Sequence, residues 1–424
     1  MNVLLYSPEL FGHPQIYCQV ISDILVERGC QVTLLVGLDE EQALRDWPDL
    51  AAIAGSPGIR VVACSEFSGA TRRELTAEEL VAAQRDTGAD ATLLVDGDAF
   101  SPQFRRMADG LAPRLLGRNV AIFSRTSPWF PGEDFYSGAR IRWYHSSLRA
   151  HLGRAQRALL RRSNTPAHFF ERVLLGHRLI DVLLVKDERL GDRWGPQVRW
   201  LPDIYRPFRQ TETPELRAEY HELVSEYQTF LSTQGGREVL LFVGRGAWYR
   251  GYDIFLQLAA TDDAVAAVHC GEPYIREPGK EYTFDVDALR RQLRAEGRLF
   301  ENGRYIRSQR ALDFAVSTTR HMVSTHRLTG SSGTMLQALE LGKPTLVPDR
   351  GVLEYRTRTH GLGALYRYGD LADLRRQWQA FKETEPSSYG SRIEAFIKAF
   401  SRERVAECLV QALALDSATT AARC

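Results

Sequence analysis

A chain of 424 residues with 44% hydrophobic and 25% charged residues has the composition of a globular protein large enough for two or more domains. Its net charge of +1 argues against nucleic acid, and its six scattered cysteines, with no Cys-x-x-Cys pair, argue against zinc and for a reducing compartment. No apolar stretch reaches the length that spans a bilayer and no basic leader precedes the first strand, so we expect a cytoplasmic protein.

The first half of the chain alternates apolar runs with segments of helical spacing. The runs predict strands at 3–7, 32–36, 60–63, 91–95, 120–124, 181–185 and 198–201. Between the first two, helical spacing predicts a helix over 15–28 that ends at Gly29. Because strand–helix–strand units with short connections are parallel and right-handed, we predict a doubly wound parallel sheet.

Polar residues and glycines follow several of these strands. Ligands of a doubly wound sheet bind beyond the C-terminal ends of its strands. This rule selects Gly12, His13, Asp96, Asp98, Ser124 and Arg125. Two alternatives stay open, because Asp96 and Asp98 are typical of a turn and His13 of an ordinary loop.

The segment 140–178 is rich in arginine and contains one acidic residue, Glu171. An apolar stripe at helical spacing runs through 148–159. The pattern fits a helix that lies on a membrane surface or binds an anionic acceptor. A helix that packs its stripe on the protein and solvates its arginines is the alternative.

The periodic pattern lapses at 205–208, which predicts a crossing between two domains. A polar helix is predicted over 214–231, and strands and helices then alternate again. Predicted strands lie at 239–243, 264–270, 299–300, 321–324 and within 343–348, and predicted helices at 252–259, 369–381 and 391–415.

Two loops of this second half have features of phosphate sites. The loop 244–251 combines glycines with Arg245 and Arg250, which can pair with phosphate oxygens. The unit 321–348 is predicted as strand, loop, short helix and strand, with Ser331 and Ser332 before the helix. The start of such a helix presents N–H groups and the positive end of its dipole to an anion.

The order of these features resembles the retaining GT-B glycosyltransferases that use nucleotide sugars, in particular family 4. The resemblance covers nearly the whole chain and is clearest from 239 to 365. Its motifs are Val243-Gly244-Arg245, Arg250-Gly251-Tyr252-Asp253 with arginine for lysine, Gly271-Glu272-Pro273, Arg304-Tyr305-Ile306, the helix within 331–343, and Gly351-Val352-Leu353-Glu354.

The resemblance implies an α/β fold of GT-B architecture. Two Rossmann-like domains would enclose a cleft: an acceptor domain at 1–205 and a donor domain at 206–398, with a helix at 399–424 that crosses back to the first domain. The implied enzyme is a hexosyltransferase-like transferase that moves a sugar from a nucleoside-diphosphate sugar to a hydroxyl of a small-molecule or glycan acceptor. Retention is implied, with no metal or other cofactor, and a homodimer is left open.

The strand-end rule, the charges of the phosphate loop and the resemblance together predict roles for residues. Catalysis falls to Arg245, Arg250, His13 and Asp98. Donor binding falls to Gly244, Tyr305, Ile306, Thr329, Gly330, Ser331, Ser332, Gly333, Thr334 and Gln337. Acceptor binding falls to Gly12 and Arg125.

This chain departs from the family at two glutamates, whose places are taken by Thr329 and Gln337. The family's histidine of the first half is also not evident, because Asp98 and Arg125 occupy the candidate strand ends. Gln337 can still bond ribose hydroxyls, but Thr329 supplies no carboxylate to the sugar. The departure leaves two rival hypotheses open. One is a nucleotide-sugar-binding homologue with weak or no transfer, and the other is a nucleotide-sugar epimerase of the same fold, which would need carboxylates around the sugar.

Overall fold

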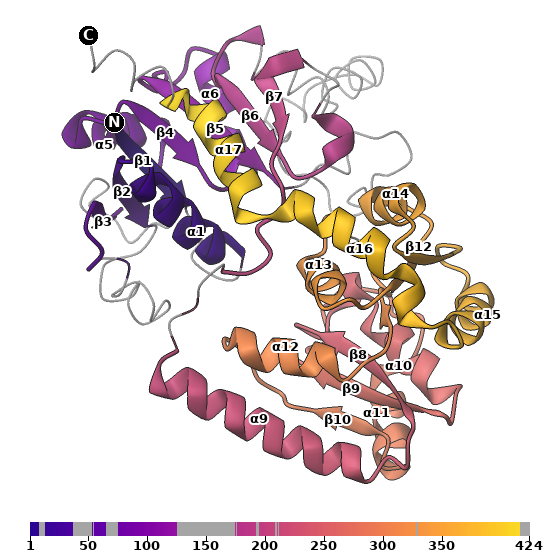
Figure 1. The fold of residues 1–424 in the computed structure, drawn as a ribbon. Helices are drawn as coiled ribbons and strands as arrows, with labels where there is room; N and C mark the ends of the chain where they lie inside the picture. Colours follow the sequence, from indigo (N-terminus) through magenta and orange to yellow (C-terminus); the bar gives the residue numbers. More distant parts are fainter. Residues whose placement is uncertain are drawn as a thin grey trace, which may run out of the picture. The chain divides into compact units, whose positions relative to one another are not determined.

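The computed structural model describes residues 1–7, 13–36, 53, 55–64, 75–124, 174, 176–191, 195–207, 210, 212–327 and 330–415. The chain forms two compact units (Figure 1). Unit 1 comprises Met1–Pro207 and Phe400–Cys424, and unit 2 comprises Phe208–Ala399. The apolar stripe predicted at 148–159 lies outside the described residues, so its membrane or acceptor contact stays a prediction.

Unit 1 is built on one parallel sheet. Its strands are β1 (Asn2–Ser7), β2 (Gln31–Val36), β3 (Ile59–Ala63), β4 (Ala91–Leu94), β5 (Arg118–Phe123), β6 (Val182–Val185) and β7 (Val198–Trp200). They lie in the order β3-β2-β1-β4-β5-β6-β7, and every neighbouring pair is parallel. The chain therefore starts inside the sheet, builds one edge and then returns to build the other, as the doubly wound prediction requires.

Four described helices cover this sheet: α1 (His13–Glu27), α5 (Ala77–Thr87), α6 (Gly97–Ala108) and α17 (Arg402–Leu413). Leu4 and Tyr6 of β1 share one apolar cluster with Phe100 and Phe104 of α6 and with residues of α5. Helices α1 and α17 contact each other, and α17 also contacts β5 and β7. The late helix thus completes the layer over a sheet made much earlier in the chain.

Unit 2 contains two parallel sheets of three strands each. The strands are β8 (Glu238–Val243), β9 (Val265–Cys270), β10 (Leu299–Glu301), β11 (Met322–Val323), β12 (Thr345–Pro348) and β13 (Gly363–Tyr366). The sheets run β10-β9-β8 and β11-β12-β13, and β11 lies next to β8. Across both sheets the order repeats that of the first six strands of unit 1.

The helices of unit 2 pack on both faces of these sheets. They are α9 (Pro214–Ser232), α10 (Tyr252–Ala260), α11 (Val286–Ala295), α12 (Gln309–Ser317), α13 (Gly333–Glu340), α14 (Gly351–His360), α15 (Leu371–Lys382) and α16 (Gly390–Ile397). Leu240 and Phe242 of β8 belong to a cluster with α10, α11 and α15. Val239 and Leu241 belong to a cluster with α9, α12 and α13. Both faces of β8 are buried, which explains why its sequence is apolar throughout.

The predicted strands agree with the observed ones to within a few residues, but the helix predicted over 391–415 is wrong as one element. It is broken into α16 and α17. Ser401 has an extended backbone and accepts the N–H of Arg404, so it begins a new helix there. Phe400 next to it packs edge-on against Trp200, with ring centroids 5.6 Å apart. The break directs α17 into unit 1.

Candidate functional site

Two loops at the C-terminal ends of the unit 2 strands lie against each other. The first, 244–251, follows β8, and the second begins at Ser324 after β11. Gly251 has φ of 70°, and a Cβ there would lie 1.9 Å from the carbonyl oxygen of Thr325, so only glycine permits this approach. Thr325 Oγ1 donates a 3.0 Å hydrogen bond to the Arg250 carbonyl. The predicted phosphate loop therefore lies beside the loop that leads to the predicted donor helix.

The two arginines of the predicted phosphate loop have different surroundings. Arg245 is exposed, whereas Arg250 is half-buried. The Arg250 guanidinium donates through Nη1 to the carbonyl oxygen of Val243. It also lies so close to Gly244 that a Cβ there would be 2.1 Å from Nη1. Arg250 is thus fixed against the end of β8, while Arg245 is accessible to a ligand.

Helix α13 starts at Gly333 and is capped by Ser332, whose Oγ accepts the N–H of Met335 at 3.4 Å. Ser331 Oγ accepts a 2.7 Å hydrogen bond from Nη1 of Arg356, a residue of α14 that is 2% exposed. The N–H groups of Gly333 and Thr334 belong to the first turn, where a helix offers donors and its positive dipole end. The predicted anion site thus has a buried guanidinium behind it.

The residues predicted to contact the nucleoside differ in their exposure. Gln337 is 6% exposed, and its Nε2 donates a 2.9 Å hydrogen bond to Asp313 Oδ1, so its amide nitrogen is engaged within the protein. Ile306 is 5% exposed and packs in the core. Tyr305 beside it is 42% exposed. A base at this position would meet the Tyr305 ring and the backbone of Ile306 rather than the Ile306 side chain.

Three large hydrophobic side chains of unit 2 are exposed among the residues described: Tyr249, Ile275 and Tyr305. They lie on the loops that follow β8, β9 and β10. These loops lie at the C-terminal ends of parallel strands, which is where sheets of this kind bind ligands.

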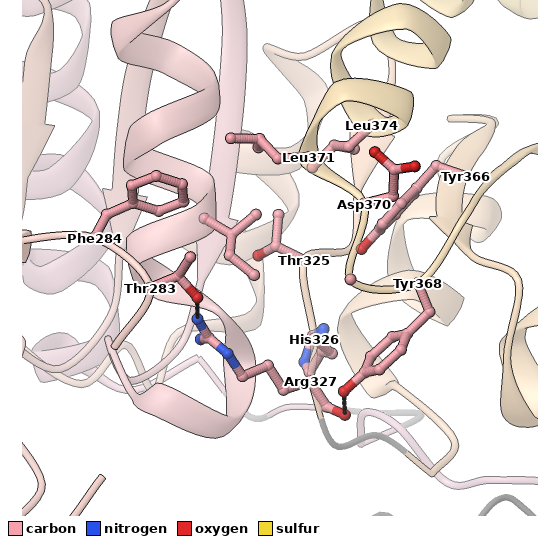
Figure 2. Close-up of a pocket in the computed structure, with 12 residues that line it drawn as sticks. Thr283, Phe284, Thr325, His326, Arg327, Tyr366, Tyr368, Asp370, Leu371 and Leu374 are labelled. Atoms are coloured by element: carbon pink, nitrogen blue, oxygen red, sulfur yellow. Dashed lines mark hydrogen bonds between the residues drawn. The ribbon is translucent and has the colours of Figure 1, made fainter. Parts of the chain in front are cut away.

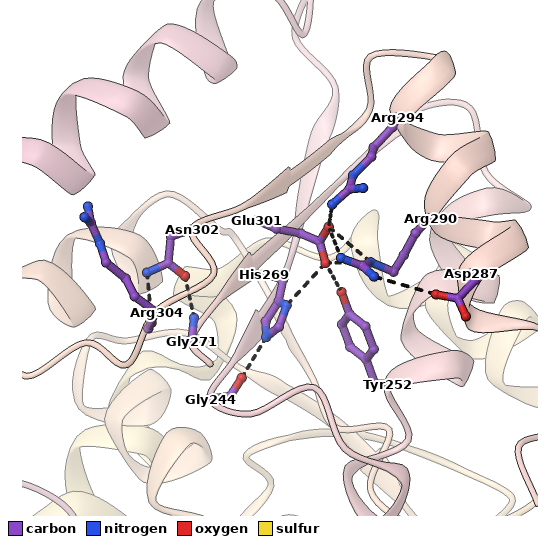
Figure 3. A network of polar contacts seen from close by, with 10 residues as sticks. All are labelled: Gly244, Tyr252, His269, Gly271, Asp287, Arg290, Arg294, Glu301, Asn302 and Arg304. Carbon is purple, nitrogen blue, oxygen red and sulfur yellow. Dashed lines mark hydrogen bonds and ion pairs between the residues drawn. The ribbon is translucent and has the colours of Figure 1, made fainter. Parts of the chain in front are cut away.

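A buried polar network contacts the phosphate loop at the Gly244 carbonyl (Figure 3). His269 Nε2 lies 2.8 Å from the Gly244 carbonyl oxygen and must carry the proton, because a carbonyl only accepts. His269 Nδ1 lies 3.7 Å from Oε1 of Glu301, beyond hydrogen-bond distance, and this oxygen accepts hydrogen bonds from Tyr252 and Arg290. Burial alone would raise the pKa of Glu301, but His269, Tyr252 and Arg290 outweigh it and lower that pKa from 4.5 to about 2.

A cavity lies between α10, α15 and the loop after β11, and Arg327, the partner of the second buried carboxylate Asp253, lines it (Figure 2). Arg327 Nη1 and Nη2 each donate at 2.7 Å to the oxygens of Asp253, and Asp253 Oδ2 accepts the N–H of Thr283 at 2.8 Å. His326 lines the same cavity and shares a 2.9 Å hydrogen bond with Ser324. Burial, and then the charge of Arg250, lower the pKa of His326 to about 3, so this histidine is neutral at physiological pH.

The candidate residues of unit 1 are only partly described. Gly12 and Arg125 lie outside the described residues, as does Thr329 of unit 2, and His13 is described only as the first residue of α1. Asp96 caps α6 by accepting the N–H of Ala99 at 3.2 Å, which favours the turn alternative. The Asp98 carboxylate is 3% exposed and accepts the N–H of Ser124 at 2.7 Å.

Two further searches concern the described ranges only. Within them no group of three His, Cys, Asp or Glu side chains could hold a metal ion. None of their helices is both long and apolar enough to cross a membrane.

No protein-family model and no curated protein sequence matches the chain. Solved structures do match it over nearly its full length. Sucrose-phosphate synthase of Thermosynechococcus elongatus aligns with a TM-score of 0.58 and 16% identity over 99% of both chains. HepE of Anabaena, solved with UDP, aligns with a TM-score of 0.59 and 11% identity over 97% of this chain and 99% of its own. WaaG, a glycosyltransferase involved in lipopolysaccharide biosynthesis, aligns with a TM-score of 0.55 and 12% identity over 97% and 99%.

The chain has the GT-B fold. The fold expected from the resemblance is therefore confirmed. In GT-B terms, the loops after β8, β9, β10 and β11 and the start of α13 belong to the C-terminal domain.

Sequence reasoning did not single out four residues that shape this edge: Glu301, His326, Arg327 and Arg356. One signal was available, since the motif Arg250-Gly251-Tyr252-Asp253 places an acid at a helix start, and a buried acid needs a partner. Nothing in the local sequence names Arg327 as that partner, because it comes from the loop after another strand.

Proposed function

We propose that the protein is a glycosyltransferase that moves a hexose from a nucleoside-diphosphate sugar to an acceptor hydroxyl, with retention of configuration and without a metal. The observation that carries the proposal is the contact of the glycine–arginine loop 244–251 with the loop that leads to α13. Structural neighbours with the same fold include HepE, solved with UDP, and WaaG, a glycosyltransferase.

The geometry suits the leaving group of this reaction. Cleavage of a sugar–phosphate bond develops negative charge on the diphosphate, which preorganised donors stabilise. Arg245 and the first N–H groups of α13 would bind the phosphate oxygens directly. Arg250 is tied to Val243 and Arg356 to Ser331, so both would contribute fixed positive charge close to the same oxygens. Each well-aimed donor contributes about 3 kcal/mol to lowering the barrier.

Binding without turnover is the second candidate function. The family glutamates are replaced by Thr329 and Gln337, and the Gln337 amide nitrogen is bonded to Asp313. The loss of both glutamates favours a protein that holds a nucleotide sugar and lacks a carboxylate at the reacting sugar.

The two candidates are separated by calorimetry with nucleoside diphosphates, followed by detection of sugar transfer to a panel of hydroxyl acceptors. A transferase releases diphosphate from its bound donor faster when the acceptor is added, and chelation of metals leaves that rate unchanged. Donor binding with no acceptor-dependent release would support the second candidate, and no binding to any diphosphate would exclude both.

Arg245→Ala tests the phosphate assignment. Loss of a charged hydrogen bond should weaken diphosphate binding by about 1.5–3 kcal/mol and leave binding of the free nucleoside unchanged. The matched control is Arg358→Ala, which removes an exposed arginine of α14 whose Nε pairs with Glu354. An equal loss for diphosphate and nucleoside in Arg245→Ala would place that side chain away from the phosphates.

A further inference from the structure

We propose that Glu272 and Tyr305 form a nucleobase site that selects guanine, so that the donor is a guanosine-diphosphate sugar. This inference rests on the proposed function. Glu272 is the half-buried residue that directly follows Gly271 after β9, and Tyr305 is the exposed tyrosine on the loop after β10.

The two loops are joined by one asparagine (Figure 3). Asn302 Oδ1 accepts the N–H of Gly271 at 2.7 Å, and Asn302 Nδ2 donates to the Arg304 carbonyl at 3.1 Å. Glu272 and Tyr305 each come one residue after these two tied positions. The backbones next to Glu272 and Tyr305 are therefore joined by the same amide.

The base site is also joined to the phosphate loop. The N–H of Gly246 donates to the Glu272 carbonyl at 3.4 Å. A Cβ on Gly271, whose φ is 155°, would lie 2.3 Å from the Gly244 carbonyl oxygen, so the two backbones are in van der Waals contact. If a nucleotide places its phosphates beside Arg245 and the start of α13, then Glu272 and Tyr305 lie on neighbouring loops at the same edge of the sheet.

The Glu272 carboxylate has no hydrogen-bond or ion-pair partner in the part of the chain that the structure describes. The other carboxylate near Tyr305 is engaged: Glu219 Oε1 accepts the N–H groups of Arg307 and Ser308 at 2.8 Å each. Partial burial, and then the charges of Glu272 and Glu219, raise the pKa of Tyr305, which agrees with a carboxylate beside its hydroxyl. An unpaired carboxylate beside an accessible aromatic ring is a ready acceptor for a ligand.

The chemistry of this pair discriminates among bases. A tyrosine ring stacks on any base, so it gives affinity without selection. An ionised carboxylate only accepts, and its two oxygens match two parallel N–H donors. Guanine presents such a pair on its pairing edge, N1–H and the 2-amino group. Adenine and cytosine present one amino donor beside an acceptor nitrogen. Uracil and thymine present one N–H between two carbonyls. In both cases the neighbouring acceptor repels the second carboxylate oxygen.

The test is calorimetric titration of the full chain with GDP, IDP, UDP, dTDP and ADP. We expect GDP to bind at least tenfold more tightly than UDP, dTDP or ADP, because only guanine presents two parallel N–H donors to the two carboxylate oxygens. IDP retains N1–H and lacks the 2-amino group, so it should bind about fivefold to tenfold more weakly than GDP.

Glu272→Gln is the variant that assigns the selection to this side chain. It should abolish the GDP preference over IDP and leave the affinity for UDP within about twofold. Glu281→Gln is the control, because it removes the same charge from the same loop and is exposed. Trp248 Nε1 bonds the Glu281 backbone carbonyl, which the substitution retains. This control should keep every affinity of the parent chain.

Three outcomes would overturn the inference, and they differ in what they say of the proposed function. Tighter binding of another diphosphate than of GDP would refute guanine selection and leave the transferase proposal standing. A GDP preference over IDP that persists in Glu272→Gln would remove Glu272 from the base site. No binding of any diphosphate would refute the proposed function and this inference with it.

Discussion

The two buried carboxylates of unit 2, Glu301 and Asp253, are compensated by partners that differ in number and in exposure to solvent. Glu301 is surrounded by side chains from β9, α10 and α11, and its arginine partners are 21% and 56% exposed. Asp253 is fully buried and pairs with one guanidinium that is itself 11% exposed. A shared, partly solvated network tolerates the loss of one member, whereas an isolated buried pair does not. The Glu301 network is therefore suited to a loop whose position can change, and the Asp253–Arg327 pair to a loop whose position is fixed.

Among the substitutions that test this comparison, Arg327→Met should lower the free energy of unfolding most. This change leaves the Asp253 charge buried with only backbone donors, so unfolding free energy should fall by about 3–5 kcal/mol. Chemical denaturation measures it. Lys398→Met is the control, since it breaks a pair whose members are 74% and 73% exposed and should cost less than about 1 kcal/mol. Equal effects of the two substitutions would contradict the distinction between the two carboxylates.

Glu301→Gln should have the next largest effect, about 2–3 kcal/mol at neutral pH. The pKa of Glu301 is lowered from 4.5 to about 2, so its stabilising contribution is complete above pH 4.5 and is lost as pH falls from 4.5 towards 2. Unfolding free energies measured across that range should therefore fall less steeply in Glu301→Gln than in the parent chain. Parallel pH profiles would show that Glu301 is not held ionised by its neighbours.

The smallest predicted effect is a difference in diphosphate binding between two variants, His269→Gln and His269→Asn. Glutamine can place an amide donor near the position of Nε2, whereas asparagine cannot reach the Gly244 carbonyl. His269→Asn should therefore weaken diphosphate binding by about 1 kcal/mol more than His269→Gln does, with nucleoside binding equal in the two. If both variants bind diphosphate alike, the histidine bond does not position the phosphate loop.

The fold was more predictable from the sequence than the site. Strands such as 239–243 are buried on both faces, so their apolar runs are visible locally, and Gly251 and Ser332 mark the turns beside them. The pairing of Asp253 with Arg327 joins residues 74 positions apart, and the Gln337 amide is engaged by Asp313, 24 positions earlier. Local patterns cannot rank such long-range partners, because their energy depends on burial that only the folded chain creates.

Helix α17 has a consequence for how the chain is made. Val405 and Leu409 are 0% exposed within unit 1, yet the ribosome makes them after all of unit 2. Domains generally fold as they emerge during synthesis. Unit 2 can therefore fold while the first unit still lacks the helix that contacts β5 and β7, and the apolar surface that α17 covers stays exposed until residues 402–413 emerge.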